Sequence, residues 1–172
     1  LNPNSCKEIF IPFLEKKGLI NHKDFCIIYN PHFIAQGSTI HNLNKPDLLL
    51  MGVDHVKSKK KIKSFYKKIY KKKNIYKILN LTESEIAKLG INSYITNKIT
   101  FANYISEVSE KLDNVNAVNI LSAIGKDSRI GNLYLKLGTK FSGPCFPRDN
   151  KSLSFFFKIN SVNSELFKNI DK

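Results

Sequence analysis

The sequence predicts an α/β chain in two parts: a part built on a parallel sheet, then an all-α part led by one long helix. Before residue 80, short apolar runs alternate with a helical pattern at the spacing of strand–helix–strand units. From Leu81 to about Leu112, an apolar pattern of helical period continues without a proline. We place the boundary near residue 80, which gives domains over 1–80 and 81–172.

The first part is expected to open with a helix and a buried strand. Apolar residues at helical spacing predict a helix over 6–17, with Asn4 or Ser5 as its N-cap, although Pro12 in its middle argues against it. Residues 24–29 are almost continuously apolar, which is typical of a strand buried on both faces.

Two further strands and a helix complete the first part. Residues 47–52 form a second apolar run, and 75–79 form a third. The lysine-rich residues between them predict a helix over 56–73. A strand, a helix and a strand at this spacing predict that the two strands pair in parallel.

The second part is organised by the long helix. Thr82-Glu83-Ser84-Glu85 has the pattern of a capping box and predicts where the helix begins. Two apolar stripes follow it: Ile91, Ile95, Ile99, Ala102 and Ile105 form one, and Tyr94, Phe101, Val108 and Leu112 form the other. A helix that is apolar on two sides is packed on two sides, so we expect it to bridge layers or domains. A shorter helix over 115–124 and further helical segments follow.

Composition narrows the functional class. The net charge is +14, from 28 basic and 14 acidic residues, a balance often associated with nucleic acid or anionic surfaces. Lysine, asparagine and isoleucine are abundant throughout, whereas arginine occurs only as Arg129 and Arg148, which indicates an AT-rich coding bias. The three cysteines are too few for a disulfide framework and favour a reducing, cytoplasmic location. No apolar run has the length of a membrane span.

The stretch from Gly138 to Asp149 holds one cysteine between two glycines and two prolines, which restrict the backbone around Cys145. Asp149 stands where the N-cap of a following helix is expected. A thiol beside a helix N-terminus lies in positive potential, which favours the thiolate and makes Cys145 a candidate nucleophile. A cysteine buried between Phe141 and Phe146 would also fit the composition.

Residues 143–149, Gly-Pro-Cys-Phe-Pro-Arg-Asp, and residues 125–132, Gly-Lys-Asp-Ser-Arg-Ile-Gly-Asn, resemble the active-site region of the UDP-glucose/GDP-mannose dehydrogenase family. Further segments that resemble the family lie at 30–38, 46–52, 87–92 and 98–103, so the resemblance spans nearly the whole chain. It implies the end of a parallel Rossmann-like sheet, followed by a central all-α domain that mediates dimerisation.

The resemblance also implies NAD as cofactor, a nucleotide sugar as substrate and a homodimer as the assembly, with no membrane. Family members begin with a Gly-x-Gly-x-x-Gly dinucleotide-binding turn, and no Gly-x-Gly occurs here. They end with a further nucleotide-binding domain. We therefore expect this chain to be a fragment that is inactive alone, and we assign no cofactor-binding residue.

The family oxidises the C6 alcohol of a nucleotide sugar to a carboxylate with two NAD⁺. We expect UDP-glucose to become UDP-glucuronate, with GDP-mannose and UDP-N-acetylhexosamines as alternative substrates. Cys145 matches the nucleophile that forms a thiohemiacetal and then a thioester. Lys88 and Asn92, one helical turn apart, match groups that stabilise the oxyanions. Asp149 matches an aspartate that positions or activates water.

The resemblance implies four substrate-binding residues. Arg129 and Lys136 match positions that bind the nucleotide sugar, the arginine acting across the dimer interface with its bidentate guanidinium. Phe141 matches an aromatic residue of the sugar pocket, and Phe33 lies in a segment assigned to substrate binding. Ordinary surface charge would also explain Lys136 and Lys88, and core packing would also explain Phe141.

Two positions depart from the family pattern. His32 stands where the family usually has a glutamate that assists thioester hydrolysis or acid–base steps. An imidazole can act as a base near neutral pH, but the change can also mark slowed hydrolysis. Lys140-Phe141-Ser142-Gly143 replaces the usual Gly-Phe-Gly-Gly, and the added side chains would reshape the loop around Cys145.

Two other functions stay open. Basic clusters over 57–61 and 67–73, interleaved with aromatic residues, would suit DNA or RNA. Helical spacing places four apolar residues on one face of this helix: Ile62, Phe65, Tyr66 and Ile69. We expect that face to cover the sheet and leave the lysines in solvent, which argues against nucleic acid. A non-catalytic dimerisation relative is the other alternative, supported by His32 and the missing glycine turn.

Overall fold

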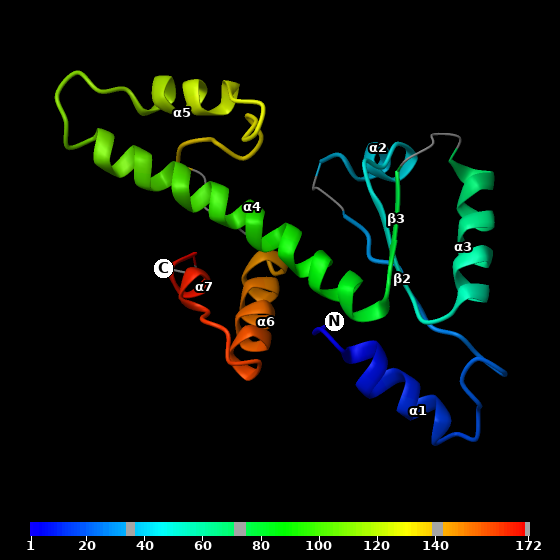
Figure 1. Ribbon diagram of the computed structural model, residues 1–172. Coiled ribbons are helices and arrows are strands. Elements are labelled where there is room, and N and C mark those ends of the chain that lie inside the picture. The colour runs from blue at the N-terminus through cyan, green and yellow to red at the C-terminus, as the bar shows by residue number, and fades with distance from the viewer. Residues whose placement is uncertain (34–36, 71–74, 139–142, 171–172) are drawn as a thin grey trace. The chain divides into compact units, whose positions relative to one another are not determined.

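The structure, a computed structural model, describes residues 1–33, 37–70, 75–138 and 143–170. The chain divides into two compact units, Leu1–Lys88 and Leu89–Lys172. The division falls inside one long helix, α4 (Leu81–Ser109), which is the longest ribbon in Figure 1. In the part of the chain that the structure describes, no helix combines the length and the apolar character needed to cross a bilayer.

The first unit is built on a small sheet whose described strands, in spatial order, are β1 (Ile28–Tyr29), β2 (Leu49–Val53) and β3 (Tyr76–Leu79). β2 and β3 pair in parallel, with Leu49 opposite Tyr76, as the strand–helix–strand pattern predicts. β1 runs antiparallel to β2, with Ile28 opposite Val53. The sheet is therefore mixed, and the expectation of parallel strands holds for the β2–β3 pair.

The predicted strand over 24–29, buried on both faces, is wrong in length and burial. β1 has only two residues, both half-buried, at the edge of the described sheet. The residues before it form a turn, in which the Asp24 carboxylate accepts the backbone N–H of Ile20 (2.8 Å) and the His22 N–H donates to the Phe25 carbonyl (2.9 Å). An antiparallel edge strand beside a parallel pair is a common arrangement.

Helix α3 (Val56–Ile69) covers one face of the sheet, as Figure 1 shows. The buried residues of this core are Leu49, Met51, Tyr66 and Ile75, with Ile62 partly buried beside them. Phe65 and Ile69 were expected on the same covered face, but both are more than half exposed. That expectation is wrong because the sheet is narrow, so the stripe made by Ile62 and Tyr66 is enough to cover it.

The expected helix over 6–17 forms in two pieces, a π-helical turn over Cys6–Phe10 and then α1 (Ile11–Glu15). Pro12 lies in the first turn of α1, where its missing N–H costs no hydrogen bond. A short helix that the sequence analysis did not predict, α2 (Thr39–Asn44), follows β1 in the chain.

A buried glutamate from α4 caps the first helical turn of the chain. Ser5 makes no side-chain cap, and Asn4 adopts a left-handed backbone conformation with φ of 70°. The backbone N–H groups of Asn4 and Cys6 instead donate to the two carboxylate oxygens of Glu85, at 2.7 and 2.9 Å. Glu85 is completely buried. The predicted cap at Asn4 or Ser5 is therefore replaced by a side chain from far along the sequence.

The capping box of α4 lies two residues before its predicted place. The Asn80 side chain accepts the Glu83 N–H (2.8 Å), and the Glu83 carboxylate accepts the Asn80 N–H (2.9 Å). These reciprocal bonds define a capping box with Asn80 as N-cap. The assignment of Thr82 and Glu85 to this motif is wrong, because Glu85 is engaged by the N-terminal turn.

Gly52 lets the first turn of α4 approach β2 closely. A Cβ at this position would overlap the Ser84 hydroxyl and lie 3.1 Å from the Leu81 Cα. Any larger residue at position 52 would push the start of α4 away from the sheet.

The second unit is helical. After α4 it contains α5 (Ala117–Lys126), α6 (Cys145–Ile159) and α7 (Glu165–Ile170). Ala102 of α4 packs with Leu121 of α5 and with Leu135 from the loop that follows. Asn116 caps α5 by accepting the N–H groups of Val118 and Asn119.

The two apolar stripes of α4 differ in exposure. Ile99 and Ala102, from the first stripe, are buried. The second stripe is exposed along its length, with Tyr94 at 66%, Phe101 at 44% and Val108 at 48% of their full accessible area. Within this chain, the side of α4 that carries Tyr94, Phe101 and Val108 is therefore an uncovered apolar surface.

Candidate active site

Cys145 is the first residue of α6 and its side chain is exposed. Gly143 has a left-handed backbone with φ of 88°, and Pro144 occupies the N-cap position. The partial positive charge at the start of α6 therefore acts at the cysteine. The alternative of a cysteine buried in the core is wrong. The prediction of Asp149 as N-cap is also wrong, because α6 begins four residues earlier, where Pro144 supplies a helical φ.

Asp149 lies one helical turn after Cys145, on the same face of α6. It is almost fully buried, at 2% exposure. Its Oδ2 accepts a hydrogen bond from the Asn92 side-chain amide (2.6 Å), and its Oδ1 accepts from the Arg148 guanidinium (2.9 Å). The structure thus brings together Asn92 and Asp149, two of the predicted catalytic residues, and adds Arg148, which the sequence analysis did not assign.

α4 holds α6 in place through buried polar contacts. The Thr96 hydroxyl lies 3.2 Å from the Asn150 side-chain oxygen, and both residues are completely buried. Thr96 is one turn after Asn92, and Asn150 follows Asp149, so this contact fixes the register in which Asn92 meets Asp149. Neither Thr96 nor Asn150 was singled out from the sequence, because a lone polar residue in a helix carries no distinct pattern.

In the first unit, Lys88 and Phe33 meet. The Lys88 ammonium lies 5.5 Å from the centre of the Phe33 ring, within cation–π range. Asn30 anchors the segment that carries Phe33, since its amide donates to the Leu50 carbonyl (2.9 Å) and its oxygen accepts from the Tyr66 hydroxyl. His32, between these residues, is exposed.

Arg129 is exposed and paired with Asp127 in the loop after α5. Its Nη2 lies 2.6 Å from Asp127 Oδ2, and its Nε donates to Oδ1 at 3.0 Å. These hydrogen bonds lower the pKa of Asp127 below its usual value of 3.8 and raise the pKa of Arg129. The sequence analysis quoted Asp127 in the motif but gave it no role. Here it orients the guanidinium.

Two further residues shape the Arg129 loop. The Lys98 ammonium of α4 donates to the carbonyls of Ile130 (3.0 Å) and Gly131 (3.2 Å). Gly125 is buried in α5, where a Cβ would overlap the Asn132 side chain. The absence of a side chain at Gly125 therefore lets the loop that carries Asn132 lie close to α5. This explains why the motif over 125–132 begins with a glycine.

Lys136 is exposed and follows the buried Leu135. Phe141, the predicted sugar-pocket aromatic, lies outside the described residues, as do Lys140 and Ser142 of the altered loop.

A groove of about 550 Å³ lies in the first unit at the carboxyl ends of β2 and β3. It is lined by Ile11, Val53 and Leu81 on its apolar side and by Lys7, Asn21 and Thr82 among its polar residues. Dinucleotides bind outside the carboxyl ends of parallel strands. The lining is both apolar and polar, and it also includes His22 and Asp54.

Comparisons with known proteins agree with the motifs. The model for the NAD binding domain of the UDP-glucose/GDP-mannose dehydrogenase family matches residues 1–70, and the model for its central domain matches residues 82–172. The chain belongs to this family. The predicted resemblance is therefore confirmed, and the match to the NAD binding domain supports the prediction of NAD as cofactor.

Curated relatives are named UDP-glucose 6-dehydrogenase. The protein from Rickettsia bellii is 31% identical over 96% of this chain, and the protein from Rhizobium meliloti is 30% identical over 76% of it. The chain spans 37% of the length of the first relative and 30% of the second.

Solved structures confirm the fold class. A UDP-glucose dehydrogenase from Pyrobaculum islandicum covers 98% of this chain with a TM-score of 0.86 and 25% identity, and the chain covers 38% of it. A GDP-mannose dehydrogenase from Pseudomonas aeruginosa covers 99% of this chain with a TM-score of 0.69, and the chain covers 39% of it. Because the two sequences are only 20% identical, this likeness supports the fold alone. The end of a Rossmann-like domain followed by a helical central domain is thus the architecture of this chain.

Proposed function

We propose that the natural protein containing these residues is an NAD-dependent nucleotide-sugar 6-dehydrogenase, and that UDP-glucose is its substrate. The observation that carries this proposal is an exposed Cys145 at the start of α6, one turn from a buried Asp149 that Asn92 holds. Relatives named UDP-glucose 6-dehydrogenase favour UDP-glucose over GDP-mannose and UDP-N-acetylhexosamines.

When bound, NAD⁺ would supply the oxidant for two successive losses of hydride from C6, and the chemistry needs a nucleophile between these two oxidations. Once C6 is an aldehyde, the Cys145 sulfur bonds to its carbon and the carbonyl electrons move to oxygen, giving a thiohemiacetal. Loss of its C6 hydride restores the C=O bond as a thioester. Water then adds to the thioester carbon and the C–S bond breaks. The sugar carboxylate is released, and Cys145 is again a thiolate. One alcohol, two NAD⁺ and one water become one carboxylate, two NADH and three protons.

In the second unit, Asn92 would stabilise the thiohemiacetal oxygen, and Asp149 would act on the water that attacks the thioester. An amide has two N–H donors, one of which goes to Asp149. The other can donate to the thiohemiacetal oxygen. The Asp149 carboxylate, fixed by Asn92 and Arg148, would orient the water that attacks the thioester and accept its proton.

In the first unit, Lys88 would stabilise the alkoxide that forms before the first hydride leaves. Its ammonium lies against Phe33, which would hold it in place. His32, exposed on the same segment as Phe33, would take the role of the usual glutamate as a base.

Arg129 would bind an anionic or hydroxylated part of the nucleotide sugar. Its guanidinium is already oriented by Asp127, which occupies the Nε and Nη2 side of the fork. A ligand would therefore meet the remaining N–H groups or displace the carboxylate. Lys136, exposed further along the same loop, would add a point charge.

The protein would form a homodimer through the exposed stripe of α4. Tyr94, Phe101 and Val108 recur at seven-residue spacing and leave an apolar surface that a second copy would cover. Light scattering of the chain should give a dimer, and Phe101→Glu should give a monomer. Phe155→Glu, which changes an exposed phenylalanine on α6, should leave the dimer intact. A Phe101→Glu protein that stays dimeric would contradict this interface.

The three cysteines are all free, and this state supports a cytoplasmic location for the protein.

The decisive experiment measures NADH formed by the natural protein, with UDP-glucose, GDP-mannose and UDP-N-acetylhexosamines supplied separately. We expect two NADH per UDP-glucose. Cys145→Ser should lose turnover while still binding NAD⁺, because without the sulfur no thioester forms. Cys26→Ser, at another exposed cysteine, is the matched control and should keep turnover. A folded protein that binds NAD⁺ but forms no NADH with any of these sugars would instead favour the non-catalytic alternative.

A further inference from the structure

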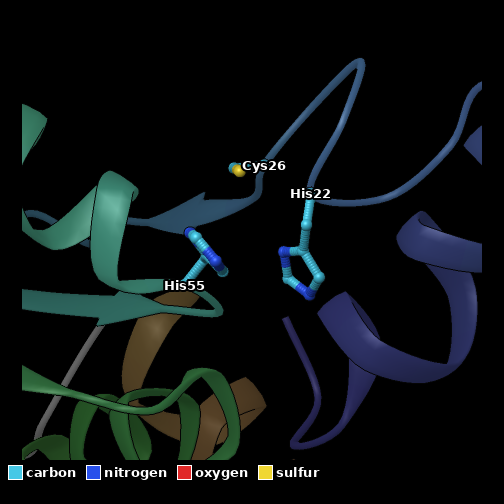
Figure 2. A group of neighbouring side chains, drawn as sticks. All are labelled: His22, Cys26 and His55. Atoms are coloured by element: carbon cyan, nitrogen blue, oxygen red, sulfur yellow. The ribbon is translucent and has the colours of Figure 1, made fainter.

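A group of side chains suited to metal binding lies in the first unit. It contains none of the residues proposed for catalysis, but His22 also lines the groove at the carboxyl ends of β2 and β3. One ring nitrogen of His22, one of His55 and the sulfur of Cys26 all lie within 4.8 Å of one another. Figure 2 shows His22 and Cys26 on the segment that leads into β1, and His55 on the turn between β2 and α3. We propose that His22, Cys26 and His55 bind a Zn²⁺ ion.

The backbone around His22 and Cys26 is already folded for this purpose. His22 has a left-handed backbone, with φ of 65°, and its N–H donates to the Phe25 carbonyl at 2.9 Å. An isolated bridge joins Asn21 and Phe25. This tight turn returns the chain on itself, so two residues four apart in sequence present their side chains to the same place.

Asp54 ties this turn to the third ligand. Its side chain is only 7% exposed, its Oδ2 accepts the backbone N–H of Ile27 (2.9 Å), and the same oxygen lies 4.0 Å from His22 Nδ1. Ile27 follows Cys26, and Asp54 precedes His55. One nearly buried carboxylate therefore holds both halves of the cluster together and adds negative charge beside a bound cation. Carboxylates in this position orient histidine ligands at many metal centres.

The donor set selects the ion. Two imidazoles and a thiolate are ligands of Zn²⁺, whereas Mg²⁺ and Ca²⁺ prefer oxygen. Tetrahedral zinc with Zn–N of about 2.0 Å and Zn–S of about 2.3 Å places ligand atoms roughly 3.3–3.6 Å apart. Small rotations of His22 and Cys26, both exposed, would close the cluster to these distances. A water molecule would complete the coordination.

His55 also caps α3, and this second role has a consequence. Its Nδ1 accepts the backbone N–H of Lys57 at 3.1 Å, so in the neutral ring the proton sits on Nε2. If Nδ1 binds zinc, its lone pair is no longer available to Lys57. If Nε2 binds zinc, the proton moves to Nδ1, which then cannot accept. Zinc binding therefore releases the Lys57 N–H in either case.

Cobalt substitution tests the site directly, because Co²⁺ takes zinc positions and a cobalt–thiolate bond gives a charge-transfer absorption band. We expect the reduced, metal-free chain to bind one Co²⁺ with this band, and Zn²⁺ to abolish the band by displacement. Cys26→Ser should remove the band. Cys145→Ser, at the other exposed cysteine, should retain it. Absence of the band in the unaltered chain, or its persistence in Cys26→Ser, would overturn the proposal.

The histidines are tested by variants that keep the fold. His55→Asn preserves an N-cap for α3 while removing the imidazole, since asparagine is a favourable cap. His55→Asn and His22→Asn should each weaken zinc affinity at least about tenfold. Losing a group that only supports a metal ligand already costs about this much, and these variants lose the ligand itself. His41→Asn, at an exposed histidine of α2, should change nothing. Equal affinities in all three variants would refute the assignment.

Amide exchange gives a readout that is independent of affinity. Zinc should speed exchange of the Lys57 N–H in the unaltered chain, because its acceptor is lost. In His55→Asn, where the cap is an amide, zinc should leave this rate unchanged. An unaltered chain whose Lys57 exchange does not respond to saturating zinc would exclude His55 as a ligand.

Discussion

Glu85 and Asp149 are both carboxylates with almost no exposure, one in each unit, but their partners differ in kind. Glu85 accepts two backbone N–H groups, from Asn4 and Cys6, and it also hydrogen-bonds the Cys6 thiol. Asp149 accepts from the side chains of Asn92 and Arg148, one turn from an exposed cysteine. A buried carboxylate is costly unless it is hydrogen-bonded. The backbone hydrogen bonds of Glu85 join two segments of the chain and have a structural role. The side chains that bind Asp149 lie near an exposed nucleophile and have further N–H groups that can bind a substrate.

The comparison is most sharply tested by Asp149→Asn in the natural protein. We expect turnover to fall at least about a hundredfold, the usual range for losing a group that transfers a proton. NAD⁺ binding should persist, because Asp149 lies outside the first unit. NADH formation and NAD⁺ affinity measured on the same preparation check this. Turnover within a few-fold of the unaltered protein would show that Asp149 is structural, as Glu85 is.

Glu85→Gln should have the next largest effect, on stability. Replacing the carboxylate turns two charge-assisted hydrogen bonds into one neutral bond and leaves a backbone N–H facing an amide. The expected loss in the free energy of unfolding is about 1.5–3 kcal/mol. Denaturant titration measures it, with Glu107→Gln on the exposed surface of α4 as a control that should stay within about 0.5 kcal/mol. Equal stability of the two variants would mean that Glu85 does not hold the N-terminal turn.

A third effect depends on pH and concerns Cys6, the cysteine beside Glu85. Burial, followed by the hydrogen bond and charge of Glu85, raises the pKa of Cys6 from 9.0 to about 12. The folded protein therefore keeps this thiol protonated after the unfolded chain has lost the proton. Its contribution to stability is complete below pH 9 and is lost as the pH rises towards 12, by up to about 1.4 kcal/mol per pH unit.

Denaturant titration between pH 8 and pH 11 measures this loss of stability, and alkylation with iodoacetamide at pH 8, followed by mass spectrometry, compares the exposure of the three cysteines. Cys145 and Cys26 are exposed and should be modified, whereas the buried Cys6 should be protected. Urea should make all three react alike. Modification of Cys6 at the rate of Cys145 in the folded chain would contradict its buried environment.

Sequence reasoning succeeded where a local pattern determines the structure. The apolar run before Gly52 predicted β2. The resemblance to the family singled out Asn92 and Asp149 separately, and the structure places the two side chains within hydrogen-bond distance. Sequence reasoning failed where a residue far along the chain determines the local structure. The backbone groups that bind Glu85 lie about 80 positions before it, so no local pattern shows that Glu85 is unavailable for a capping box with Thr82.

Burial was the other source of error. The exposed Phe65 and the half-buried β1 depend on how wide the sheet is, a property of the assembled unit. The period of a helix or strand predicts which residues share a face. It does not predict whether a neighbouring element is broad enough to cover that face.

The bonds between Glu85 and the N-terminal turn also bear on the order in which the protein acquires its structure. They join residues 79 and 81 positions apart. During synthesis from the N-terminus, the amides of Asn4 and Cys6 emerge long before their acceptor does. Contacts between such distant positions close a long loop and form slowly. The turn that carries Asn4 and Cys6 is therefore among the last parts of its unit to reach the native state, although it is made before its acceptor.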